Sequence, residues 1–468
     1  MKLFCLSLAL LLAASTYAQK EQPLPKDLPP FGPEKPLRAP EARKTKLENG
    51  LTVWLVPRPG FPKVSFTLAV VGGYAADPRD RPGFSQLLTA TIDQGTKKRT
   101  ARQIAEDMQD AGGDVNAFAV RDAIHISTSV LSSKTTEGLA VLADLADEAA
   151  FPDNEVTLAK RNLTDQLEQE ETDPSFQANR AIAKVLFGNG PYAVFSPTRD
   201  SLAAATSAEL RGEFARRFRP DQAALLVVGD FSLDQMLSLI RGKFGAWHSP
   251  SSPPVAPASA PSVTAPRAIF IVPRPESVQT TLAFGASGPH RGDSDFETTE
   301  VANAIYGGMF GSRLVNNIRE DKGYAYSPSA FLQSFRSAGA MRTQADVRNA
   351  ATGPSFNEIL YEMNRMVTTS PTENELQQAK RNLVGIEAIS LQSNDEVAGE
   401  LADLWMRGLP PEEIGNYGRK VAAITADEVN AAAKKYFPAA HFSVVAVGEE
   451  KVIREALAPF GLPMVPAP

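Results

Sequence analysis

The sequence predicts an α+β fold of two homologous halves, each a mostly antiparallel sheet with helices packed on one face. Three observations support this fold class. The chain contains an internal repeat, a proline-rich segment separates the two copies, and apolar residues within each copy follow both strand-like and helix-like spacing. Strands gathered into such a sheet, with helices on one face, are typical of the α+β class.

The internal repeat consists of four pairs of segments that occur in the same order in both halves. Their separation lies between 216 and 220 positions, and chance would hardly produce four such pairs in register. The pairs are Val56-Pro57-Arg58-Pro59 with Val272-Pro273-Arg274-Pro275, Ala159–Leu163 with Ala379–Leu383, Arg216–Pro220 with Lys434–Pro438, and Leu225–Gly229 with Val444–Gly448.

The elements expected in the first half are strands and helices of ordinary length. Val64–Val71 is an apolar run typical of a buried strand, Ile124–Val130 alternates like a strand, and Thr100 can cap the helix that follows it. The expected strands are Val64–Val71, Ile124–Val130 and Ala223–Gly229. The expected helices are Pro82–Ile92, Ala101–Ala111, Thr135–Ala150, Asn154–Gln169, Ser207–Phe218 and Leu233–Phe244.

Composition shifts divide the chain into five segments. Residues 1–18 have a positive start, a short apolar run and small residues at a cleavage position, as secretory signal peptides do, so we expect cleavage after Ala18. Residues 19–40 form a proline-rich arm. The N-terminal domain is expected at 41–248, a proline-rich linker at 249–266, and the C-terminal domain at 267–468.

Composition and charge limit the possible functions. The hydrophobic fraction of 43% and charged fraction of 22% are those of a soluble globular protein, and we expect no membrane span after the signal peptide. The net charge of −6 argues against nucleic acid as the main partner. The single cysteine, Cys5, lies in the expected signal peptide, so the mature chain would have neither a disulfide nor a thiolate ligand. The expected destination is the periplasm.

The two-half arrangement resembles the insulinase/pitrilysin peptidase family, from about Pro40 onward. The resemblance includes Leu47–Leu51 before the first strand, Gly72-Gly73 before Asp77, and Gly83 and Gly95-Thr96 around a helix. Active members of the family carry H-x-x-E-H inside this frame. Two histidines four residues apart on one helix face bind zinc, and the glutamate deprotonates the zinc-bound water.

The resemblance fails at the metal ligands themselves. Aligned on Gly83 and Gly95-Thr96, the two histidines are replaced by Gln86 and Ala90, and the glutamate by Thr89. The four histidines of the chain, His125, His248, His290 and His441, include no pair close enough to share a helix turn. The third ligand of the family falls near Asp165–Glu168, in an ambiguous register. We therefore expect no catalytic residue, no metal ligand and no cofactor in this chain.

The second half keeps a signature that the resemblance assigns to substrate binding. Gly307–Leu314 and Ile318–Ser327 are similar to the family's second-domain pattern, in which a glycine turn leads into a helix and the helix into a strand. The family's arginine and tyrosine, seven positions apart, match Arg319 and Tyr326. Their guanidinium and phenol groups would bind the substrate carbonyl and stabilise an oxyanion.

Other interpretations of these residues are possible from the sequence. Arg319 could pair with Glu320 or Asp321, and Tyr326 could be a packed strand residue. The glycines at 307, 308 and 311 could suggest a phosphate site, but no Lys-Ser/Thr follows them, so they do not form a P-loop. Asn116-Ala117 resembles the edge strand that pairs with substrate in the family, or is only structural.

The resemblance implies a division of labour between two chains. Our leading hypothesis is a heterodimer in which a homologous H-x-x-E-H subunit supplies zinc and the general base, while this chain supplies Arg319 and Tyr326 for extended peptide substrates. One alternative is a stand-alone structural or peptide-binding protein without peptidase activity. Another is an independent enzyme with an unrecognised site, which the scarcity of histidines disfavours.

Overall fold

The computed structural model describes residues 41–259 and 266–468. The expected signal peptide (1–18), the proline-rich arm (19–40) and residues 260–265 of the expected linker lie outside the described residues. The described part of the expected linker, 249–259 and residue 266, contains no helix or strand.

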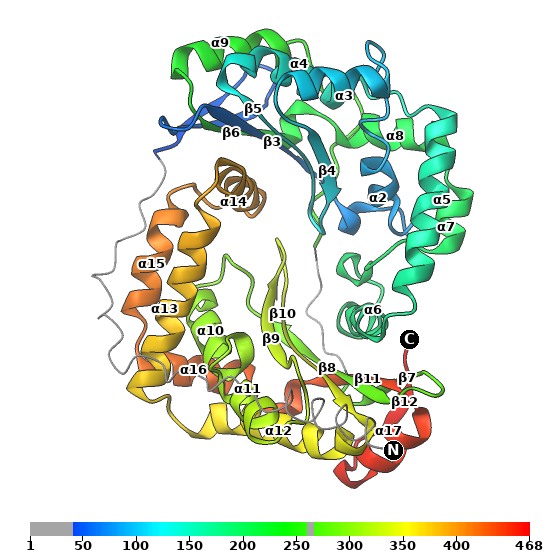
Figure 1. The fold of residues 1–468 in the computed structure, drawn as a ribbon, viewed down its shortest axis with the longest axis vertical. Coiled ribbons are helices and arrows are strands. Elements are labelled where there is room, and N and C mark those ends of the chain that lie inside the picture. The colour runs from blue at the N-terminus through cyan, green and yellow to red at the C-terminus, as the bar shows by residue number, and fades with distance from the viewer. Residues whose placement is uncertain (1–40, 260–265) are drawn as a thin grey trace, which may run out of the picture. The chain divides into compact units, whose positions relative to one another are not determined.

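Within the described ranges, the strands form two six-stranded sheets, one in each half (Figure 1). The first sheet has the order β1-β2-β6-β3-β5-β4 and the second β12-β7-β11-β8-β10-β9. The first-half strands are β1 (Arg43–Lys46), β2 (Thr52–Pro57), β3 (Lys63–Val71), β4 (Val115–Ala119), β5 (Ala123–Leu131) and β6 (Ala223–Gly229). The second-half strands are β7 (Ile269–Pro273), β8 (Gln279–Gly288), β9 (Ser329–Ser334), β10 (Gly339–Arg348), β11 (Ser443–Gly448) and β12 (Met464–Pro466).

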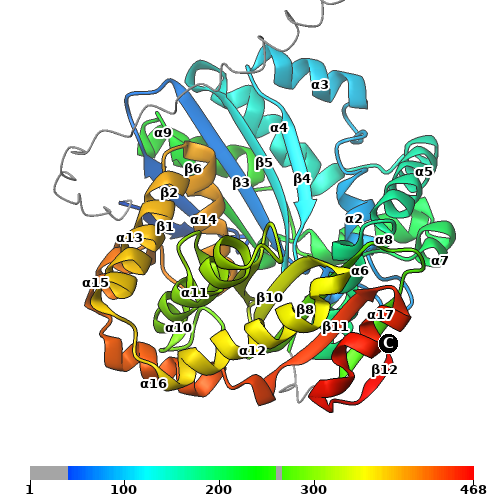
Figure 2. The same cartoon turned by 60° about the horizontal axis from the view of Figure 1, so that its bottom comes forward.

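The helices of both halves lie between and around these strands (Figures 1 and 2). The first-half helices are α2 (Phe84–Thr89), α3 (Ala101–Asp110), α4 (Thr135–Glu148), α5 (Asp153–Glu170), α6 (Pro174–Phe187), α7 (Arg199–Ala204), α8 (Ser207–Arg217) and α9 (Leu233–Phe244). The second-half helices are α10 (Phe296–Asn303), α11 (Arg313–Val315), α12 (Thr352–Thr368), α13 (Glu373–Ser390), α14 (Asn394–Met406), α15 (Glu413–Ala423), α16 (Ala426–Tyr436) and α17 (Glu450–Leu457). Two π-helical turns, η5 (Ala304–Gly308) and η6 (Asn316–Asp321), flank α11.

The two sheets confirm that the chain is duplicated. The order β2-β6-β3-β5-β4 in the first sheet corresponds to β7-β11-β8-β10-β9 in the second. In each sheet one of these pairs is parallel, β2 with β6 and β7 with β11, and the three that follow are antiparallel. Only the outermost strands differ, because β1 pairs antiparallel to β2 whereas β12 pairs parallel to β7. The predicted α+β class with mostly antiparallel sheets is confirmed.

One of the repeated sequence segments makes an equivalent contact in both halves. Lys160 on α5 donates from Nζ to the carbonyl oxygen of Ala203 at 2.8 Å, and Lys380 on α13 donates to that of Ala422 at 2.9 Å. The repeated Ala-Lys-Arg-Asn-Leu segment therefore ties a long helix to the end of a shorter neighbour in each half.

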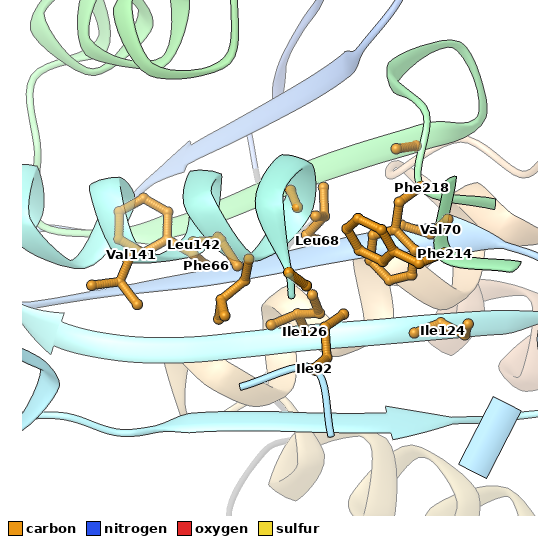
Figure 3. Close-up of a cluster of buried hydrophobic side chains, with 14 of the residues drawn as sticks. Phe66, Leu68, Val70, Ile92, Ile124, Ile126, Val141, Leu142, Phe214 and Phe218 are labelled. Carbon is orange, nitrogen blue, oxygen red and sulfur yellow. The ribbon is translucent and has the colours of Figure 1, made fainter. Parts of the chain in front are cut away.

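The largest part of the hydrophobic core of the first half lies between its sheet and its own helices (Figure 3). Phe66, Leu68 and Val70 alternate along β3 and point toward Val141 and Leu142 of α4 and the aromatic rings of α8. All are buried. This alternation follows from the two-residue period of a strand, which directs every second side chain to one face.

The opposite face of each sheet is covered by a helix from the other half. Helix α14 packs against β3 and β6 of the first sheet, where Leu401 and Val397 contact Trp54, Val56 and Leu226. Helix α6 packs against β8 and β11 of the second sheet. The prediction of helices on one face is thus correct for each half alone, and the exchanged helices cover the second face.

In the part of the chain that the structure describes, no helix combines the length and the hydropathy that a membrane crossing requires.

We predict that Leu401→Ala lowers the free energy of unfolding by about 2–5 kcal/mol, because a fully buried leucine in the α14 contact leaves a cavity. Urea unfolding monitored by circular dichroism measures this. The matched control is Leu158→Ala on α5, whose side chain is 51% exposed and whose loss should have little effect. Equal effects of the two substitutions would contradict a stabilising role for α14.

Candidate functional site

The three positions that align with the zinc motif lie on α2 and its C-cap. Gln86 is half-buried, and buried Thr89 donates its hydroxyl to the carbonyl oxygen of Gln86 at 3.1 Å. Ala90 is exposed at the C-cap. A neutral amide, a hydroxyl already bonded to its own helix and a methyl group do not make a zinc-binding face with a general base.

The carboxylates near the expected third ligand lie on α5, which contacts α2. Asp165 is 4.0 Å from Arg161, and Glu168 is 3.3 Å from Arg199, with all four side chains more than half exposed. Within residues 41–259 and 266–468, no group of three or more His, Cys, Asp or Glu side chains is arranged to hold a metal ion.

A buried ion-pair network holds the start of α2. Arg217 on α8 and Asp77 are fully buried, with Nη2 of Arg217 3.0 Å from Oδ1 of Asp77. Asp77 also accepts hydrogen bonds from the backbone N–H and the hydroxyl of Ser85 in the first turn of α2. Arg217 donates further to the carbonyl of Gly72 at 2.7 Å. These contacts of Asp77 and Arg217 hold the start of α2 in place, and we call them the clamp of this helix.

The second half repeats this ion pair in a more exposed form. Lys435 on α16 binds Asp295 at the N-cap of α10 at 2.7 Å, with the lysine side chain 62% exposed. Arg217 and Lys435 occupy equivalent places in the repeated segments, as do Asp77 and Asp295. The conserved placement of the pair in both halves shows that it belongs to the duplicated fold.

Gly83 supports the same frame because no other residue fits there. Its φ of +75° lies in the left-handed region, and a Cβ atom would be 2.3 Å from the Cα atom of Pro197. The chain can therefore turn into α2 only at a glycine.

The glycine-rich segment of the second half leads into a helix, as predicted. The turn η5 ends at Gly308, Ser312 caps α11, and the chain continues into η6, which carries Arg319. A Cβ atom on Gly307 would be 2.8 Å from the Cβ atom of Ala330, so this glycine allows η5 to approach β9 closely. Packing, rather than a phosphate ligand, explains that glycine.

A tight turn after η6 returns Tyr326 to Arg319. The backbone N–H of Gly323 donates to the carbonyl of Arg319 at 3.1 Å, and that of Tyr324 donates to Ile318 at 2.8 Å. The Arg319 guanidinium consequently lies 5.0 Å from the centre of the Tyr326 ring and 4.8 Å from that of Phe310. The structure brings the two predicted site residues together.

The two predicted residues differ in their exposure to solvent, since Arg319 is half-buried. Tyr326 is 81% exposed and precedes β9, so the interpretation of it as a packed strand residue is wrong. Arg319 does pair with Glu320, at 3.0 Å, but the two side chains are 30% and 47% exposed, and ion pairs that solvent reaches contribute little stability. Its guanidinium retains N–H groups that an incoming carbonyl can reach.

Two neighbours with defined contacts were not predicted from the sequence. Phe310 is 67% exposed, and its ring is the second aromatic ring beside the Arg319 guanidinium. Arg313 is buried and binds Glu375 on α13 with two hydrogen bonds of 2.6 and 3.0 Å. Burial opposes ionisation of Glu375, but the bonds from Arg313 and Thr372 prevail and lower its pKa to about 2. Arg313 therefore anchors the helix that leads to Arg319.

The edge strand expected from Asn116-Ala117 is present. These residues lie on β4, which is the edge of the first sheet opposite β1, and β9 is the edge of the second sheet opposite β12. The outer backbone groups of an edge strand can pair with an extended peptide.

His125 lies beside this edge strand and is buried. Its ring stacks on Phe118 of β4 with the centroids 5.0 Å apart, and Asp403 of α14 is close enough to act on its charge. Burial lowers the pKa of His125 to about 4, and Asp403 opposes this only in part. The imidazole is therefore neutral at pH 7.

Comparisons with known proteins identify the family. A model described as "Insulinase (Peptidase family M16)" matches residues 52–194, and a model described as "Peptidase M16 inactive domain" matches residues 204–383. Together they cover most of the chain. The chain belongs to the insulinase (M16) peptidase family.

Curated relatives match along most of their length. An uncharacterized zinc protease of Bacillus subtilis, YmxG, is 26% identical, covering 74% of this chain and 84% of that protein. An uncharacterized zinc protease of Mycobacterium tuberculosis is 25% identical, covering 87% and 93%.

Solved structures show the same fold. A peptidase M16 inactive domain from Pseudomonas fluorescens superposes with a TM-score of 0.81 at 22% identity, covering 92% of this chain and all (100%) of that one. A protease from Helicobacter pylori gives 0.80 at 17% identity over 87% and 99% of the chains. A chain of complex III from Candida albicans gives 0.73 at 19% identity over 89% and 97%.

We predict that Arg217→Met lowers the free energy of unfolding by about 3–5 kcal/mol, because it leaves Asp77 buried without its cation. Chemical denaturation measures the change. Arg102→Met, which removes an exposed ion pair with Glu106 on α3, is the control and should leave stability nearly unchanged. A small effect of Arg217→Met would contradict the clamp.

We predict that His125 makes stability fall as pH drops from about 6.5 to about 4. The unfolded chain binds a proton on this imidazole near pH 6.5, whereas the folded chain resists until about pH 4, so protonation favours unfolding by up to roughly 3 kcal/mol. Unfolding free energies of the wild type and His125→Phe across this range test it. Parallel curves would contradict the prediction, and His441→Asn, at an exposed site, should follow the wild type.

Proposed function

We propose that this chain is the non-catalytic subunit of a heterodimeric zinc metallopeptidase and binds extended peptides. The single observation that carries the proposal is the pairing of Arg319 with exposed Tyr326, 5.0 Å from guanidinium to ring centre. A hydrogen-bonding cation and a phenol held together by a hydrogen-bonded turn are suited to a peptide carbonyl that becomes an oxyanion.

The first half supports the same proposal because it lacks the residues that would bind zinc. Its α2 frame is intact and clamped by Asp77 and Arg217, yet Gln86, Thr89 and Ala90 offer neither paired imidazoles nor a base. Zinc and the activated water would therefore come from a homologous H-x-x-E-H subunit. The curated relatives named zinc proteases are consistent with such chemistry in the family.

The role of each residue in the assembled enzyme follows from its chemistry. Arg319 would donate N–H groups to the substrate carbonyl, and Tyr326 would donate its O–H to the same oxygen as negative charge develops on it. The edge strands β4 and β9 offer backbone donors and acceptors for an extended peptide. We further propose that the pair works in the periplasm, in keeping with the signal-like residues 1–18.

We predict that zinc-dependent peptide cleavage occurs only when this chain is mixed with a homologous H-x-x-E-H subunit. In that mixture, Arg319→Ala and Tyr326→Phe should each reduce kcat/KM by about 10²–10³-fold, the usual cost of losing one oxyanion donor. A fluorogenic peptide assay with and without a chelator provides the measurement.

Two matched controls separate the site from general damage. Tyr361→Phe removes the hydroxyl of another exposed tyrosine, on α12, and Arg102→Ala removes an exposed arginine on α3. Both should retain full activity. Full activity of the Arg319 and Tyr326 variants would refute their role, and peptide binding without cleavage in any mixture would favour a stand-alone peptide-binding protein.

A further inference from the structure

Two arginines from different halves, the buried Arg342 and the half-buried Arg121, interact through their charges and have no acidic partner among the described residues. Arg121 follows β4 in the first half, and Arg342 lies on β10 in the second. Their charges repel, and burial together with this repulsion lowers the pKa of Arg342 to about 10. Among the described residues, no carboxylate lies within ion-pair distance of either guanidinium.

Arg342 is the more deeply buried of the two. Its side chain points toward α6, and the residue is 4% exposed. Its Nη2 donates to Oδ1 of Asn179 on α6 at 2.9 Å, but its buried Nε has no acceptor. The ring of Phe331 on β9 lies 5.7 Å from the guanidinium carbon. A neutral amide is the only hydrogen-bond acceptor that the described chain offers this cation.

Arg121 is held between aromatic rings. Its guanidinium carbon is 5.8 Å from the ring centre of Tyr74 and 5.4 Å from that of Phe195. Burial lowers the pKa of Arg121, and its buried Nε also has no acceptor. The terminal nitrogens of Arg121 have no acceptor among the described residues, so they are free to bind a ligand.

The one carboxylate that acts on the charge of Arg121 is engaged elsewhere. Asp122 attracts Arg121 but accepts hydrogen bonds from the Tyr192 hydroxyl at 2.8 Å and from the backbone N–H of Arg336 at 2.9 Å. Neither guanidinium therefore has an ion-pair partner among the described residues, whereas buried charges are normally paired.

We propose that Arg121 and Arg342 form a subsite for a carboxylate of the bound peptide, either its C-terminus or an Asp or Glu side chain. The inference rests on the proposed function, since it assumes that the chain binds peptides. Guanidinium groups match carboxylate geometry, and the surrounding rings suit the apolar part of the residue that carries it. Arg121 lies two residues after the end of edge strand β4, so a peptide paired with β4 would extend toward the subsite.

The register of β10 indicates how far the proposed subsite lies from the Arg319–Tyr326 pair. Ala325, next to Tyr326, is bridged to Val347 on β10, five residues from Arg342. At roughly 3.3 Å per strand residue, the Arg342 backbone lies about 16 Å from that point. A peptide would thus place its carboxylate some five residues from the carbonyl bound at Arg319 and Tyr326.

The test is a binding assay with this chain alone. Three labelled decapeptides are compared by fluorescence anisotropy: one with a free C-terminus and an internal Glu, its C-terminal amide, and its Glu→Gln form. We expect one change, the amide or the Gln, to weaken binding about tenfold or more, which also tells which carboxylate is used. Equal binding of the three peptides, or no binding of any, would overturn the subsite.

Variants then assign the preference to these residues. Arg121→Met and Arg342→Met should abolish the discrimination between peptides, whereas Arg102→Met should keep it. Asn179→Asp would place a carboxylate next to Arg342. This variant should therefore raise Tm and abolish the discrimination between peptides. The control Asn154→Asp, at an exposed position of α5, should do neither. Retained discrimination in folded Asn179→Asp protein would contradict the assignment. Cleavage in the two-subunit mixture remains an independent test of the proposed function.

Discussion

The reciprocal exchange of α6 and α14 is the constraint on which the rest of the structure depends. Each sheet buries one face against its own helices and the other against a helix from the opposite half. Without α14, for example, the first half would expose an apolar surface that includes Trp54, Val56 and Leu226. The exchange thus fixes the two halves to each other through hydrophobic burial, without disulfides.

The contacts that hold α2 in place do not involve the positions that align with the zinc motif. The frame around α2 is stabilised by Asp77, Arg217 and Gly83, none of which aligns with a ligand position. The ligand positions Gln86 and Ala90 make no comparable buried contact, so changing them costs the fold little. Stability and metal binding reside in different residues of one helix and its frame.

The sequence predicted the elements and the pairing of halves because these leave periodic signals. The strand Val64–Val71, the helix capped by Thr100 and the four repeated segments are all present in the structure. It also predicted the pairing of Arg319 with Tyr326, through a family pattern and not through spacing alone. Their proximity depends on the turn at Gly323, which closes η6 back on itself.

Other features left no readable signal in the sequence. Helix α6 was not predicted, and nothing in its sequence shows that its apolar residues, such as Ile182 and Leu186, pack against the sheet of the other half. Arg121 and Arg342 are isolated arginines far apart in the chain, and only tertiary packing makes them neighbours without a counter-charge. Isolated charges normally suggest solvated surface, so burial had to be observed.

The central claim is that this polypeptide cannot hold a catalytic metal by itself. The most direct measurement is the zinc content of the purified, zinc-saturated and desalted chain by mass spectrometry, combined with a proteolysis assay on the same sample. The account predicts no stoichiometric zinc and no cleavage. One tightly bound zinc ion per chain, together with proteolysis by the chain alone, would contradict it.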